Sequence, residues 1–128
     1  MNDTTREWFT KVEADFRTAA RELAAADGPN YDAVCFHAHQ CVEKPMKGLL
    51  LQRGSIPPRT HDLPELGRLV SVNHPAWSAP LEDLRFLTRA SVAYRYPGES
   101  ADRGEAEQAL GIASRLRDIL LALSRNLT

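Results

Sequence analysis

The chain has 128 residues, of which 43% are hydrophobic and 26% are charged. This size and composition are typical of one globular domain and exclude a disordered chain, which would have fewer apolar residues or more net charge. Sixteen basic and seventeen acidic residues leave a formal net charge of −1. No overall positive field would therefore attract nucleic acid, although a local basic patch remains compatible with the sequence.

Apolar residues recur every three to four positions in five segments, which is the spacing of amphipathic helices. The first two segments cover residues 4–26 and 30–52, and Asp27-Gly28-Pro29 ends the first of them. Pro45 lies inside the second segment, where a proline removes one backbone hydrogen bond. Because the apolar spacing continues past it, we expect one helix with a kink near residues 41–45.

The remaining segments cover residues 62–72, 79–95 and 102–125. Asp62 with Glu65, and Asp102 with Glu105, have the spacing of a capping box, which satisfies the first backbone amides of a helix. No stretch alternates with period two, so we predict no strands. The predicted fold is all-α: an up-and-down bundle of four long helices plus one short helix, as a single domain over residues 1–128.

The apolar runs are far too short to span a membrane, and the first residues lack the apolar stretch of a signal peptide. We therefore expect a cytoplasmic protein that does not bind a membrane. Cys35 and Cys41 lie six positions apart and point in different directions on a helix, so we expect two reduced, buried side chains. We expect no metal, since four ligands at close spacing are missing, and no cofactor.

Segment 30–52 carries an unusual set of polar residues. His39 with Glu43, and Gln40 with Lys44, are four apart and share a helix face, and Glu43 is also four residues before Lys47. One interpretation is a solvated, charged helix face. The other is a polar seam, formed by His39, Gln40 and Glu43, that faces a groove or a dimer partner.

Two further places are candidates for binding an anion. Thr60-His61-Asp62 stands at a helix start, where free backbone amides favour phosphate, although simple capping by Thr60 or Asp62 is the alternative. The second place is a cluster of arginines and tyrosines: Arg85, Arg89, Tyr94, Arg95 and Tyr96. Its guanidinium groups would suit phosphate or carboxylate and its phenols would suit a base. Alternatively, Tyr94 belongs to the core and the arginines are solvated.

Taken in order along the chain, three landmarks resemble the HEPN family (higher eukaryote and prokaryote nucleotide-binding domains). The first combines an aromatic first helix with the motif Tyr31-Asp32-x-x-Cys35-Phe36-His37-x-His39-Gln40-x-x-Glu43-Lys44-x-x-Lys47. The second is Thr60-His61-Asp62-Leu63, and the third is Tyr94-Arg95-Tyr96-Pro97-Gly98-Glu99. Together they cover nearly the whole chain.

The resemblance implies a bundle of four or five helices that is often a homodimer and is often encoded beside a small nucleotidyltransferase, as a toxin–antitoxin-like pair. It also implies, for some members, metal-independent RNA cleavage by an Arg-x(4–6)-His motif with a Tyr two residues after the His. This chain departs there, because Tyr94 stands where the His would follow Arg89. A phenol that titrates near pH 10 is a poor proton shuttle at neutral pH. Arg68-x5-His74 is a literal match outside the family's position.

We therefore expect a non-catalytic module that dimerises, pairs with a nucleotidyltransferase, and binds a nucleotide, RNA or an acidic ligand. The expected ligand-binding residues are Lys44, His61, Arg89, Arg95 and Tyr96, and Tyr94 would face the same groove as the polar seam. One alternative is a ribonuclease toxin, with Arg89 as phosphate clamp and His39, His61 or His74 brought close in space. The other alternative is a structural dimer without a ligand.

Overall fold

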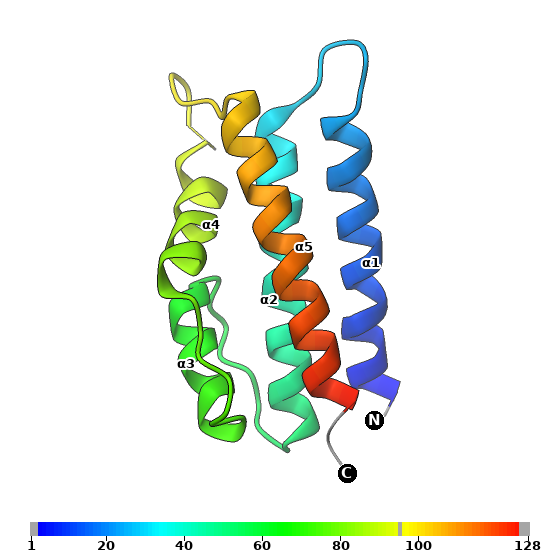
Figure 1. Ribbon diagram of the computed structural model, residues 1–128, viewed down its shortest axis with the longest axis vertical. Helices are drawn as coiled ribbons and strands as arrows, with labels where there is room; N and C mark the ends of the chain where they lie inside the picture. The colour runs from blue at the N-terminus through cyan, green and yellow to red at the C-terminus, as the bar shows by residue number, and fades with distance from the viewer. Residues whose placement is uncertain (1–2, 95, 126–128) are drawn as a thin grey trace.

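The computed structural model describes residues 3–94 and 96–125. Within these ranges it has five α-helices and no strand: α1 (Asp3–Leu23), α2 (Tyr31–Gln52), α3 (Leu63–Asn73), α4 (Leu81–Ala93) and α5 (Arg103–Arg125). Figure 1 shows that α1, α2, α4 and α5 alternate in direction and that α3 lies beneath α4 at one side of the bundle. The predicted all-helical, up-and-down bundle is confirmed.

Helix α4 is shorter than predicted. It has 13 residues, close to the 11 of α3 and far below the 21 to 23 of the other three helices. Pro80 is the residue before its first turn, and a proline keeps the residue that precedes it out of helical geometry. The expected start at residue 79 is therefore two residues too early, and the helix ends at Ala93 rather than at residue 95.

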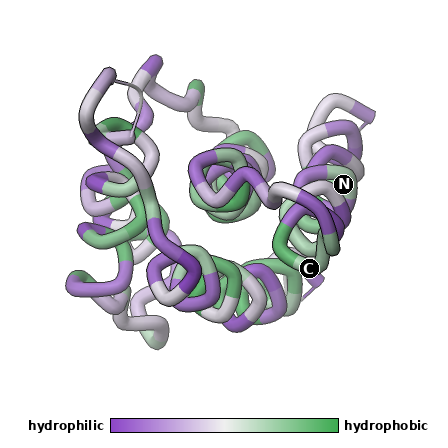
Figure 2. The backbone as a smooth tube through the Cα atoms, turned by 90° about the horizontal axis from the view of Figure 1, so that it is seen from above, coloured by the Kyte–Doolittle hydropathy of each residue, from purple (hydrophilic) through white to green (hydrophobic). Residues whose placement is uncertain are grey.

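The central element is α2, which contacts each of the other four helices. In Figure 2 the bundle is seen end-on, and one helix lies in the middle of the others. Each of the five helices contributes buried aliphatic side chains to the core, among them Val12, Met46, Leu66, Leu84 and Leu120. The predicted continuity of α2 through Pro45 is confirmed, while the expected kink stays a prediction.

One of the two predicted capping boxes is confirmed. The Glu105 backbone N–H donates to Asp102 Oδ1 at 2.7 Å, and the Asp102 N–H donates to Glu105 Oε1 at 3.1 Å. This reciprocal pair satisfies two amides at the start of α5.

The prediction of a capping box at Asp62 and Glu65 is wrong. Asp62 precedes α3, but its side chain makes no capping hydrogen bond. The N–H groups of Asp62 and Leu63 instead donate to the hydroxyls of Thr60 and Thr88, both at 3.1 Å. Glu65 is bound by Arg68 at 2.8 Å. The Thr60 hydroxyl thus takes the place of Glu65 at the Asp62 amide, and the Thr88 hydroxyl from α4 occupies the next amide, which leaves fewer free amides for an anion at this helix start.

The two cysteines are free and buried, as predicted. Cys41 donates its thiol hydrogen to the Val12 carbonyl at 3.4 Å. None of the described helices combines the length and the apolar character needed to cross a bilayer.

Candidate functional site

The polar residues of α2 are largely buried. His39, Glu43 and Lys47 are 1%, 4% and 7% exposed, so the interpretation as a solvated face is wrong for these three. Lys47 Nζ donates to Glu43 Oε2 at 3.1 Å, which is the expected ion pair one turn along the helix. Lys47 Nζ also lies 6.0 Å from the centre of the Trp8 ring on α1.

His61, in the connection between α2 and α3, is attached to α2 at two points. Its Nδ1–H donates to Glu43 Oε1 at 2.8 Å, and its backbone carbonyl accepts from His39 Nε2 at 2.7 Å. Since Glu43 is acceptor-only when ionised, the hydrogen lies on Nδ1 and the ring's other nitrogen, Nε2, is left for another partner. The His61 side chain is 70% exposed, so that nitrogen is presented to solvent.

A second buried carboxylate joins α1 to the same helix. Asp15 of α1 is 8% exposed. Its Oδ2 accepts from Lys44 Nζ at 2.5 Å, and its Oδ1 accepts from His37 Nδ1 at 2.9 Å. Asp15 of α1 and Glu43 of α2 are therefore each bound by one lysine and one histidine, and this pairing explains how both acids are tolerated away from water.

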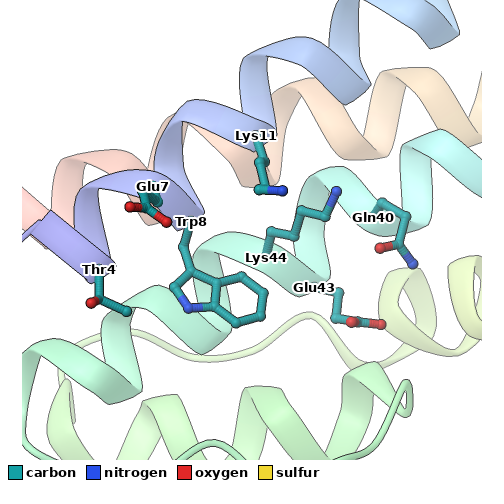
Figure 3. A pocket seen from close by; sticks show the side chains of 7 residues that line it. All are labelled: Thr4, Glu7, Trp8, Lys11, Gln40, Glu43 and Lys44. Carbon is teal, nitrogen blue, oxygen red and sulfur yellow. The ribbon is translucent and has the colours of Figure 1, made fainter.

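Between α1 and α2 the structure contains a cavity of about 470 Å³, here called the α1–α2 cavity. Figure 3 shows its seven lining side chains, which come from both helices: Thr4, Glu7, Trp8, Lys11, Gln40, Glu43 and Lys44. The volume lies within the range of small-molecule sites. Two of the three residues of the predicted polar seam, Gln40 and Glu43, thus line a cavity together with Lys44.

The charges around this cavity are balanced. Lys11 and Lys44 oppose Glu7 and Glu43. Lys44 is held by Asp15, whereas the Lys11 ammonium forms no hydrogen bond or ion pair with residues 3–94 or 96–125. In Figure 3 the ammonium ends of Lys11 and Lys44 reach toward the same part of the cavity from opposite walls. One planar indole and two cations therefore face a shared space.

A second cavity, of about 320 Å³, lies between α2 and α4 and is called the α2–α4 cavity. It is lined by Asn30, Asp32, Ala33, Phe36, His37, Ala90, Ser91 and Tyr94. No lysine or arginine contributes to this described lining. Tyr94, expected beside the polar seam, is thus found at a different cavity from Lys44.

Tyr94, which stands where the resemblance implies a histidine, forms a hydrogen bond that links α4 to α5. Tyr94 is half-buried, and its O–H donates to Glu105 Oε2. This hydrogen bond to a carboxylate, followed by burial, raises the pKa of Tyr94 above its usual value of 10. A phenol that holds its proton more firmly is an even weaker proton shuttle at neutral pH than the sequence implied.

The other predicted ligand-binding residues are dispersed. Arg89 is exposed on α4 and forms no ion pair within the described part of the chain, and Tyr96 is 64% exposed. Neither lines the α1–α2 cavity. Arg85 is bound by Glu82 at 2.7 Å, so it is not an uncompensated neighbour of Arg89. Arg95 lies outside the described residues. Binding by Arg89, Arg95 and Tyr96 stays a prediction.

Arg68 and His74, which match the Arg-x(4–6)-His motif outside the family's position, have separate structural roles. Arg68 binds Glu65, one turn earlier on the exposed side of α3. His74 ends α3, and its Nε2 is buried without a hydrogen-bond partner in the described residues. Burial, with a smaller effect of Arg53, lowers the pKa of His74.

Sequence reasoning missed the α1 side of the α1–α2 cavity. From the sequence, Trp8 was included only as an apolar residue of the aromatic first helix, and no role was assigned to Lys11. A signal existed for Asp15, because it stands three residues after Val12 and four before Ala19, within the apolar stripe. An acid at such a position indicates a buried charge with a partner on a neighbouring element.

The fold and this site define a class: an all-helical bundle whose central helix carries buried ion pairs and faces two cavities. The HEPN domain family model matches residues 5–123. The chain therefore belongs to the HEPN domain family, and the resemblance seen in the sequence is confirmed.

Two solved structures support the fold. The crystal structure of TT1696 from Thermus thermophilus has a TM-score of 0.78 and 26% identity, and the match covers 94% of this chain and 98% of that one. The crystal structure of ST0689, an archaeal HEPN homologue, has a TM-score of 0.66 and 24% identity and covers 96% and 98% of the two chains. No curated protein matches the chain significantly.

Proposed function

We propose that this chain is a nucleotide- or RNA-associated binding and dimerisation module that lacks the family's catalytic histidine. The observation that carries the proposal is the α1–α2 cavity, where Trp8 lies beside Lys11 and Lys44. An indole offers a stacking surface for a base, and such stacking contributes roughly 1–3 kcal/mol. Two ammonium groups from opposite walls suit a phosphate.

The charges restrict the ligand. Because Glu7 and Glu43 offset the two lysines, the lining has no net positive charge. Lys44 must also be shared with Asp15, so a phosphate would gain mainly the Lys11 ammonium. This arrangement favours a ligand with few negative charges, such as a nucleoside monophosphate, over a triphosphate or a long RNA.

The test is calorimetric titration with nucleoside mono-, di- and triphosphates and with a short single-stranded RNA. We expect saturable binding of a monophosphate and weakening of that binding by Lys11→Ala. Arg17→Ala is the matched control, because Arg17 is an exposed cation on the same helix that does not line the cavity. Absence of binding by every nucleotide, or equal weakening by both variants, would overturn the ligand assignment.

The same proposal includes a homodimer and a nucleotidyltransferase partner, in a toxin–antitoxin-like pair. It is supported by family membership. Sedimentation equilibrium at micromolar concentration tests the dimer, and co-purification with a nucleotidyltransferase encoded nearby tests the pair. An RNA-cleavage assay at high protein concentration tests the missing activity. Cleavage that is lost in Arg89→Ala would replace this proposal with a ribonuclease.

A further inference from the structure

The side-chain amide of Gln40 is oriented by the hydrogen bonds behind it. His39 Nε2 lies 2.7 Å from the His61 carbonyl oxygen, and because a carbonyl only accepts, the ring hydrogen of neutral His39 is on Nε2. His39 Nδ1 therefore accepts from the Gln40 amide nitrogen, 3.4 Å away. The Gln40 oxygen, Oε1, lies on the other side of the amide group and forms no hydrogen bond with residues 3–94 or 96–125.

This oxygen belongs to the α1–α2 cavity, which Gln40 lines together with Glu43. The two residues are three positions apart and share a face of α2. Figure 3 shows them at the same end of the cavity, with the Gln40 oxygen turned toward Lys44 and its nitrogen turned away. The Glu43 carboxylate accepts from His61 and Lys47, but with about four lone-pair sites it can accept further hydrogens. This end of the cavity therefore offers two neighbouring acceptors.

Two neighbouring acceptors suit an exocyclic amino group, which carries two hydrogens on one nitrogen. Adenine has such a group at one edge of a flat ring, and its two fused rings cover more of the Trp8 indole than a pyrimidine would. Guanine and hypoxanthine have a carbonyl oxygen at the same position, which two acceptors would repel. An unsubstituted purine has only a C–H there and would leave both acceptors without a partner.

From these two acceptors we propose that the α1–α2 cavity selects adenine, with Gln40 Oε1 and the Glu43 carboxylate accepting the hydrogens of its amino group. This inference rests on the proposed function, in which the base stacks on Trp8 and the phosphate meets Lys11. Gln40 is then the residue that determines specificity. A neutral hydrogen bond of ordinary strength corresponds to about fivefold in affinity.

The experiment compares three ligands of the native protein by calorimetric titration at neutral pH: the 5′-monophosphates of adenosine, inosine and purine riboside. We expect adenosine monophosphate to bind about fivefold more tightly than purine riboside monophosphate and at least tenfold more tightly than inosine monophosphate. Equal affinities would overturn this inference and leave the proposed function standing. Absence of binding by all three would overturn both. Because these measurements need no variant, they do not depend on whether a substituted protein folds.

One substitution assigns the selection to its residue. Gln40→Met keeps the length of the side chain without its amide, so we expect about fivefold weaker binding of adenosine monophosphate and unchanged binding of purine riboside monophosphate. Lys11→Ala should weaken both ligands by the same factor, since both carry the phosphate. Gln108→Met, an exposed amide on α5 outside the cavity, is the matched control. Equal weakening of the two ligands by Gln40→Met would mean that Gln40 only shapes the cavity, and would overturn the inference.

Discussion

The buried Lys47–Glu43 pair provides a sharp test of the structure through Lys47→Met. This substitution keeps the length and the apolar stem of the side chain but removes the ammonium, which leaves the Glu43 carboxylate, 4% exposed, with His61 as its remaining hydrogen-bond donor. Removing one partner of a buried ion pair typically costs about 3–5 kcal/mol. Because His61 stays, we expect the lower end, about 3 kcal/mol, and a melting temperature lower by roughly 10 °C.

The assay is urea unfolding followed by circular dichroism at 222 nm at neutral pH. The control is Arg103→Met, which breaks the exposed Arg103–Glu107 pair of the same four-residue spacing and should have no measurable effect. A double variant, Lys47→Met with Glu43→Leu, should regain most of the lost stability, since an apolar pair can replace a buried ion pair. If Lys47→Met were as stable as Arg103→Met, the reasoning about burial would be refuted.

Three other predictions concern the core and its buried polar groups. Burial raises the pKa values of Cys35 and Cys41 to about 12 from 9.0, so the unfolded chain loses these protons first and stability should fall as the pH rises from 9 towards 12. A double Cys→Ala variant should flatten that pH dependence. Gly67→Ala should lower the free energy of unfolding by about 1–3 kcal/mol, because its Cβ would lie 2.8 Å from a core leucine. Gly111→Ala should raise it by about 0.5–1 kcal/mol, because its Cβ would have only an arginine nitrogen nearby, at 3.8 Å. Thermal melts compare the two variants, and equal effects would contradict the packing around Gly67. Tyr94→Phe should cost about 1 kcal/mol in urea unfolding, and an unchanged midpoint would mean that the phenol hydrogen bond contributes nothing.

The sequence was sufficient where the determining residues are close together along the chain. The five helices follow from apolar spacing, and the Asp102–Glu105 box forms because both partners lie within one turn. The same spacing at Asp62 does not form a box, because the Asp62 N–H donates to the Thr60 hydroxyl and the Glu65 carboxylate is bound by Arg68. Local pattern alone does not distinguish these two cases.

The same limit applies to the site. The spacing of Glu43 and Lys47 predicted their pairing, but their burial depends on the packing of α1 and of the α2–α3 connection against α2. The α1–α2 cavity is lined by residues of two helices that are distant in sequence, among them Lys11 and Lys44. No residue near either lysine in the sequence indicates the other. Dispersal of the predicted ligand-binding residues has the same cause, since helix α4 directs Arg89 to the outside.

The double attachment of His61 also determines how the α2–α3 connection tolerates change. With the imidazole and the carbonyl of His61 fixed to α2, the segment from residue 53 to residue 60 is a surface loop closed at both ends. Ile56 within it is 91% exposed. Lengthening a closed loop adds little entropy cost, about 0.6 kcal/mol for each doubling. An affinity tag or a fluorescent label inserted after Ser55 should therefore leave both cavities intact. The folded protein could then be immobilised through this loop.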